Sequence, residues 1–143
     1  MSSAEFRYIE HVSDAMVEAY GRTLGEAFAH SARALVNLVC NVSKVDPHKI
    51  VSIETTGFDR KSLLYNWLEK VLLVLLIDNI ILAKFEVKIK RHKDKYHLFS
   101  TCKGDNFLRQ KHEYKVEVKA ITYHGMKISD KKGKVIIRFL VDL

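Results

Sequence analysis

Apolar positions recur at helical spacing in two stretches of the chain. From Thr23 to Val42 they return every three or four residues, which predicts a helix with one buried face. Thr23 and Glu26 have the spacing of a capping box, in which each side chain satisfies a backbone N–H of the other residue. A second stripe predicts a helix from Asp59 to Leu75. Its later half is apolar on nearly every side, so we expect it to lie deep against a sheet.

Elsewhere the apolar period is two, the spacing at which side chains of an extended chain share one face of a sheet. The alternation is clearest where Phe85, Val87 and Ile89 are separated by charged residues. Strands are predicted at residues 6–10, 15–20, 50–56, 85–90, 96–102, 116–123 (extending to 128) and 135–141. This order predicts an α+β fold, a two-layer sandwich with a mixed, mostly antiparallel sheet and two main helices packed on one face. One domain spanning residues 1–143 is expected from the length.

Composition places the chain among globular cytoplasmic proteins. Hydrophobic residues make up 48% and charged residues 29%, which is ordinary for a globular domain. Cys40 and Cys102 lie far apart and outside any CxxC pair, so we expect buried free thiols in a reducing compartment. The N-terminal residues lack the layout of a secretion signal, and the longest apolar run, 71–77, is far shorter than the roughly 20 residues that cross a bilayer. No membrane contact is expected.

The net charge of +7 is concentrated in the second half of the chain. Residues 84–134 hold 15 Lys/Arg against 6 Asp/Glu, a balance of +9, whereas residues 1–83 hold 8 against 10. Such a basic region can contact RNA, including tRNA, or an acidic partner surface. It can also be a solvated sheet face whose lysines protect edge strands. The strands show no obvious exposed aromatic platform for base stacking, which argues against RNA.

The standard nucleotide-binding, zinc-protease and serine-nucleophile motifs are absent from the sequence. A stand-alone enzyme of a common class is therefore not expected. Polar residues instead interrupt three places where strands are predicted to begin or end. These are the corner from His11 to Asp14, the segment from Lys119 to His124, and Asp142 beside the last residue of the sequence, Leu143.

Two aspartates with backbone or terminal oxygens make an all-oxygen ligand set, which suits Ca²⁺ or Mg²⁺ rather than zinc. A cation between the carboxylates also removes their mutual repulsion. Alternatively, Asp14 can cap a turn and Asp142 can be an acid of a frayed terminus. His11 and His124 can likewise be ordinary surface histidines. Spacing alone leaves these alternatives open, but if Asp14 and Asp142 share one ion, the second and last strands must lie side by side.

Several segments together resemble the archease family. His11-Val12-Ser13-Asp14 is similar to the family's His-Thr-Ala-Asp corner. Residues 21–28 resemble its Gly-x-Thr-Leu-x-Glu-Ala-Phe helix start, and residues 62–68 its leucine-rich second helix. Residues 118–126 match Val-Lys-Ala-Ile-Thr-Tyr-His-x-Met, and residues 141–143 resemble the Asp-Ile ending. The departures at the corner and at the last residue remove no expected ligand oxygen.

The resemblance implies an accessory protein rather than an enzyme. Members of this family activate the GTP-dependent tRNA-splicing ligase by promoting its guanylylation and its multiple turnover. The resemblance also implies a divalent metal ion, Ca²⁺ or Mg²⁺, held by Asp14, Asp142 and an oxygen of Leu143. Lys119 stands at the position of the family's functional lysine.

Three further residues belong to the matching segments. His11 and His124 are expected to serve the partner contact or the activity. Asp59 corresponds to an acidic position before the second helix, where helix capping is the other role open to it. Other interpretations are a basic RNA-binding or chaperone-like module acting on tRNA-processing proteins, or a metal-dependent hydrolase with His11 or His124 as the base.

Overall fold

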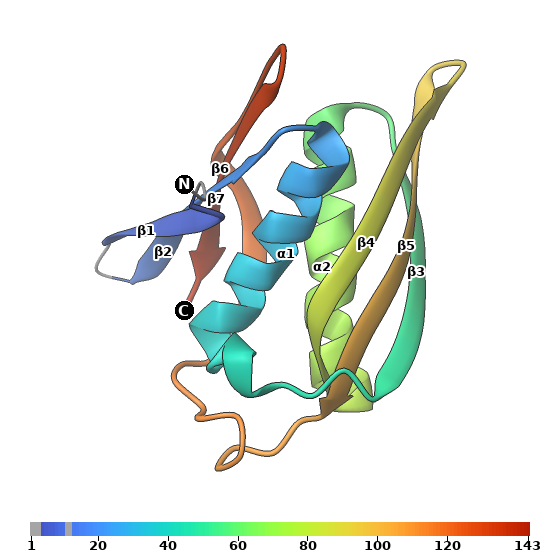
Figure 1. The fold of residues 1–143 in the computed structure, drawn as a ribbon. Coiled ribbons are helices and arrows are strands. Elements are labelled where there is room, and N and C mark those ends of the chain that lie inside the picture. The colour runs from blue at the N-terminus through green and yellow to red at the C-terminus, as the bar shows by residue number, and fades with distance from the viewer. Residues whose placement is uncertain (1–3, 11–12) are drawn as a thin grey trace.

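The computed structural model of the chain describes residues 4–10 and 13–143 (Figure 1). The described elements are β1 (Phe6–Glu10), β2 (Asp14–Gly21), α1 (Leu24–Val39), the short 3₁₀ helix η1 (Val42–Lys44), β3 (Lys49–Gly57), α2 (Arg60–Asp78), β4 (Ile80–His92), β5 (Lys95–Asn106), β6 (Ala120–Lys131) and β7 (Lys134–Asp142). The α+β class and the predicted order of strands and helices are confirmed. The described helices include none that is long and apolar enough to cross a membrane.

Within the described residues, the strands form two antiparallel sheets rather than one continuous sheet. Their orders are β1-β2-β7-β6 and β3-β5-β4. Figure 1 shows α1 and α2 between the two sheets. The first helix contacts β2 and β4, and the second contacts β3 and β6. Each helix therefore buries side chains toward both sheets, and each sheet keeps a face that points away from the helices.

The core is centred on the interface between the two helices and the sheets. Trp67 of α2 is fully buried, and its indole N–H donates to the carbonyl oxygen of Phe28 in α1 at 3.0 Å. Its ring also meets Phe85 of β4 edge-on, with centroids 5.9 Å apart. Cys40 and Cys102 are buried free thiols, as predicted. Burial raises the pKa of the Cys40 thiol to about 11, so it is protonated and unreactive at neutral pH.

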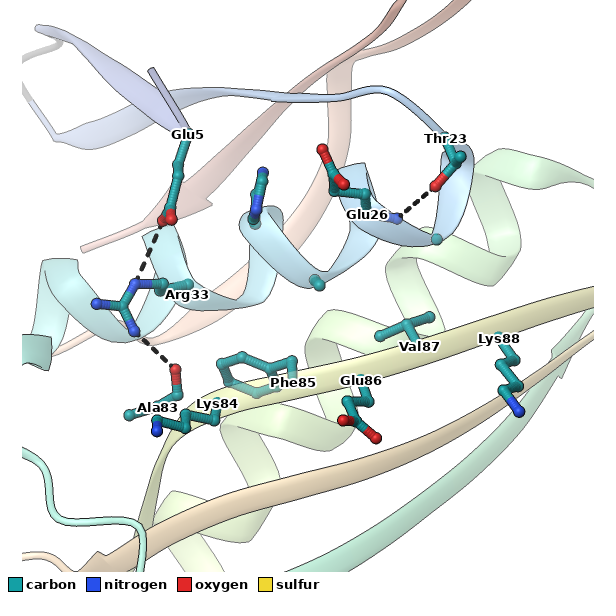
Figure 2. Close-up of a pocket in the computed structure, with 13 residues that line it drawn as sticks. Glu5, Thr23, Glu26, Arg33, Ala83, Lys84, Phe85, Glu86, Val87 and Lys88 are labelled. Atoms are coloured by element: carbon teal, nitrogen blue, oxygen red, sulfur yellow. Dashed lines mark hydrogen bonds and ion pairs between the residues drawn. The ribbon is translucent and has the colours of Figure 1, made fainter. Parts of the chain in front are cut away.

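Both predicted helix starts are confirmed, but their capping differs. At α1, Glu26 donates its backbone N–H to Thr23 Oγ1 at 3.1 Å (Figure 2), while its carboxylate accepts from the backbone N–H of Arg22 instead of that of Thr23. At α2, Asp59 Oδ1 accepts from the Ser62 N–H at 2.7 Å, and Ser62 Oγ accepts from the Asp59 N–H at 3.1 Å. This is a complete capping box, so the capping role considered for Asp59 is confirmed.

The expectation that the later half of α2 lies deep against a sheet is wrong for one side of the helix. Val71 and Leu72 are buried, whereas Leu73, Leu76 and Ile77 are 39%, 56% and 74% exposed. A helix presents side chains in every direction along each turn. Because the sheets cover only part of its circumference, an apolar sequence on all sides leaves some apolar residues in solvent.

Candidate metal centre

The register of the first sheet places two aspartates opposite each other. Asp14 begins β2 and Asp142 ends β7, and they are direct partners in the antiparallel β2–β7 pair. Directly opposed residues point to the same face, with Cβ atoms about 4.5–5.5 Å apart. The prediction that the second strand lies beside the last is therefore confirmed. Two carboxylates emerge next to each other at one end of this sheet.

A third segment of the chain reaches the same place. Lys119 donates its backbone N–H to the Asp142 carbonyl at 2.8 Å, and the next residue, Ala120, is the β6 partner of Asp142. The Lys119 side chain is exposed. On the β2 side, Leu143 donates its backbone N–H to the Ser13 carbonyl at 3.4 Å. The fold thus joins the expected ligand residues and the backbone of the expected functional lysine at the Asp142 end of β7.

Two other expected residues are not part of this arrangement. His11 lies outside the described residues, so its role stays a prediction. His124 lies where the β6–β7 register shifts between Thr122 and Lys127. It is exposed, and its backbone N–H donates to Thr122 Oγ1 at 2.9 Å. The shift carries His124 away from the regular ladder that positions Asp142.

The irregular segment of β6 packs on α2. Tyr123 stacks on Tyr65, with ring centroids 4.5 Å apart and planes 7° apart. Partial burial, followed by the nearby carboxylates of Asp59 and Glu69, raises the pKa of the Tyr123 phenol above its ordinary value of 10. Asp59 therefore lies close to the residue before His124. These two expected residues belong to the β6–α2 junction.

The chemistry of the aspartate pair suits a hard cation. No group of three or more His, Cys, Asp or Glu side chains in the described part of the chain is placed to hold a metal ion. A cation at the pair would therefore take two carboxylates, with its other ligands coming from backbone oxygens such as that of Leu143 and from water. Ca²⁺ and Mg²⁺ accept such all-oxygen sets, whereas zinc sites usually include nitrogen or sulfur ligands. The residues fit the expected Ca²⁺ or Mg²⁺.

Glu18 lies farther along β2, on the same face as Asp14, and is held by three side chains. It accepts hydrogen bonds from Arg7 Nε at 2.9 Å, from the Tyr20 hydroxyl at 2.6 Å and from Arg138 Nη2 at 2.6 Å. These hydrogen bonds, that of Arg7 first, lower the pKa of the buried Glu18 carboxyl to about 2. Because its partners come from β1, β2 and β7, Glu18 ties three strands of this sheet together.

Glu18→Gln is expected to lower the free energy of unfolding by about 1.5–3 kcal/mol near neutral pH, the range for hydrogen bonds to charged groups. Folding lowers the pKa of Glu18 from 4.5 to about 2, so its contribution is complete above pH 4.5 and is lost as the pH falls toward 2. Thermal melts of both proteins across this range measure the effect. Their melting temperatures should converge near pH 2, and a difference that stays constant with pH would contradict this role.

Comparison with known proteins decides the family. Residues 6–143 match the model of the Archease protein family. The chain is 42% identical to the protein archease of Pyrococcus abyssi over 123 residues, which is 86% of this chain and 87% of the relative. It is 38% identical to that of Sulfolobus acidocaldarius over 138 residues, 96% of this chain and 98% of the relative. The chain belongs to the archease family. The resemblance of its motifs to that family is thereby confirmed.

Solved structures agree with the archease assignment. The solution structure of protein 1598 from Methanobacterium thermoautotrophicum superposes with a TM-score of 0.84 at 36% identity, covering 97% of this chain and 99% of that one. The crystal structure of a Thermotoga maritima archease, named a possible chaperone, gives a TM-score of 0.54 at 17% identity over 100% and 98% of the two chains. At that identity the second likeness shows the fold alone. The opposed aspartates of this chain therefore lie in a structure with the archease fold.

Proposed function

We propose that this chain is an accessory protein, rather than an enzyme, that activates the GTP-dependent tRNA-splicing ligase in the cytosol. It does so by promoting guanylylation of the ligase and its multiple turnover. The observation that carries the proposal is the direct pairing of Asp14 with Asp142 in a chain of the archease family. The backbone hydrogen bond from Lys119 to Asp142 supports a role for this lysine next to the pair.

Each residue has a separate task in this proposal. Asp14, Asp142 and an oxygen of Leu143 hold a divalent cation, which when bound supplies positive charge at this end of the sheet. The exposed Lys119 pairs with an acidic group or a phosphate across the contact with the ligase. During guanylylation a nucleophile of the ligase attacks the α-phosphorus of GTP and pyrophosphate leaves. Positive charge held close to these phosphates stabilises the negative charge that develops on them.

Lys119→Ala is expected to reduce the stimulation of guanylylation by roughly tenfold or more, because a hydrogen bond to a charged group is lost. The measurement is the rate at which labelled GMP becomes bound to the ligase when GTP and this protein are added. Lys131→Ala is the matched control, since Lys131 is also an exposed lysine and lies at the other end of β6. If the wild-type protein gives no stimulation, the proposal fails. Equal losses of stimulation in both variants would indicate a general effect of positive charge and contradict a specific role of Lys119.

A contact with RNA is the second candidate function. The charge balance of +9 between residues 84 and 134 favours it. Much of this charge lies on β4 and β5, whose strands form a long hairpin that projects from the body of the protein in Figure 1. Lysines on a projecting hairpin can approach a phosphate backbone without hindrance from the rest of the chain. tRNA, the substrate class of the ligase pathway, is the RNA that this candidate function would contact.

A further inference from the structure

One face of the β3-β5-β4 sheet is open to solvent. In the central strand β5, Leu98, Ser100 and Cys102 are buried. Side chains alternate along a strand, so His97 and Phe99 project from the opposite face. Figure 1 shows both helices on one side of this sheet, and no described element covers the other side. The outward face of β5 is therefore free to bind a partner.

Aromatic rings gather on this open face. Phe99 is 40% exposed. The His97 ring lies 6.5 Å from it with planes only 12° apart, and His92 of β4 meets His97 at 6.5 Å and 65°. The sequence-based expectation that the strands lack an exposed aromatic platform is therefore wrong. The three rings come from two strands, and His97 and Phe99 are separated by the buried Leu98, so they form no run in the sequence.

Lysines lie on the β4 side of these rings, whereas Glu54 is the partner of Phe99 on the β3 side. The β4–β5 register places Lys88 opposite Phe99 and Lys90 opposite His97, so each lysine shares the outward face with a ring. Both lysines are exposed. On this face of the three strands, the charged residues are Lys84, Lys88, Lys90, Lys95 and Lys103 against Glu54 and Glu86. The rings therefore lie in a positively charged environment near the end of the hairpin.

We propose that this face binds single-stranded RNA, with bases stacking on Phe99 and His97 and phosphates contacting Lys88 and Lys90. Single-stranded nucleic acids are bound by this combination of aromatic rings and cations. A duplex keeps its bases stacked inside and would leave the rings unused. An acidic protein surface would use the lysines alone. The proposal deepens the RNA contact named above as the second candidate function, and it does not depend on activation of the ligase.

Phe99→Leu is the decisive substitution, because leucine keeps an apolar side chain in the strand but removes the ring. The probe is a fluorescein-labelled oligouridine of about twelve nucleotides, and the measurement is fluorescence anisotropy. Affinity is expected to fall at least about fivefold, the lower limit for the loss of one stacked base. Tyr8→Leu is the control, since Tyr8 is also 40% exposed and lies in β1 of the other sheet. It should bind as the wild-type protein does.

The lysines are tested through the salt dependence of the same binding. For the double substitution of Lys88 and Lys90 by alanine, the slope of log affinity against log salt should flatten by about 1.4, or roughly 0.7 for each phosphate contact to a single strand. Lys44→Ala, an exposed lysine in η1, should leave the slope unchanged.

Three results would overturn the proposal. The first is that Phe99→Leu binds as tightly as the wild-type protein, and the second is that a duplex of equal length binds as well as the single strand. The third is the absence of any binding to RNA. If the wild-type protein binds no RNA at all, the second candidate function falls as well, while the guanylylation assay still tests ligase activation independently.

Discussion

Asp142→Asn is expected to lower the affinity of the protein for Ca²⁺ by more than about 100-fold, because outer-shell substitutions alone cost about 10–100-fold. Asparagine keeps the shape of the side chain but removes one of the two charges that the β2–β7 register places opposite each other. Asp14→Asn should have a comparable effect. Calorimetric titration with Ca²⁺ measures the affinity. The melting temperature gives a second measurement, since a ligand that binds only the folded chain raises it.

Asp130→Asn is the matched control for these two substitutions. Asp130 lies in β6 of the same sheet, where its carboxylate pairs with Arg60 at 3.3 Å. It should bind Ca²⁺ as the wild-type protein does. The metal centre would be contradicted if the wild-type protein bound neither Ca²⁺ nor Mg²⁺, or if all three variants lost affinity equally.

Trp67→Ala is expected to cost about 3–5 kcal/mol of unfolding free energy, the range for removing a large buried aromatic side chain. Typical domains have only about 5–15 kcal/mol in total. Trp67 is fully buried, contacts Phe85 of β4 and donates a hydrogen bond to Phe28 of α1. Its loss therefore opens a cavity where both helices meet the β3-β5-β4 sheet. Urea unfolding followed by circular dichroism measures the change.

Two further variants serve as comparisons for Trp67→Ala. Trp67→Phe keeps most of the apolar volume but removes the N–H donor, so it should cost less than Trp67→Ala. Phe58→Ala removes an aromatic ring that is 76% exposed and should stay within about 0.5 kcal/mol of the wild-type protein. If Trp67→Ala also stayed within that limit, the closed core described around Trp67 would be wrong.

Local patterns predicted the helices well because their signals lie within a few residues. Trp67 falls on the apolar stripe of the second predicted helix, and it is fully buried. Asp59 has the expected position at the start of that helix. The adjacency of β2 and β7 came from a different source. It followed from the premise that Asp14 and Asp142 share one ion, and the strand register confirms it.

The division into two sheets could not be predicted, because it depends on which distant strands pair. Gly104 is a second feature that depends on the pairing of strands. The predicted strand ends at residue 102, two residues before Gly104, yet Gly104 is buried within β5. A Cβ atom at this position would lie 2.0 Å from the Ile81 carbonyl oxygen and 2.8 Å from Leu82 Cα. The glycine is required by the close approach of β4, which local sequence does not reveal.

The residues of the candidate site also differ in how far the sequence predicted them. Asp14, Asp142 and Lys119 were found by their resemblance to family motifs. The sequence did not predict that His124 and Asp59 lie at the β6–α2 junction, since this depends on the register shift in β6. Glu18 was missed altogether, because its three partners become neighbours only when the strands pair. An acid among apolar residues of a strand was the available signal.

The most direct test of the central claim is the number of RNA ligation events completed per ligase molecule. The assay mixes the ligase with excess RNA, GTP and Mg²⁺ and adds either the wild-type protein or Asp142→Asn, with equal folding verified by circular dichroism. We expect the wild-type protein to raise the number well above one per ligase and Asp142→Asn to leave it near the level of the ligase alone. Equal stimulation by both proteins would contradict the role of the aspartate pair.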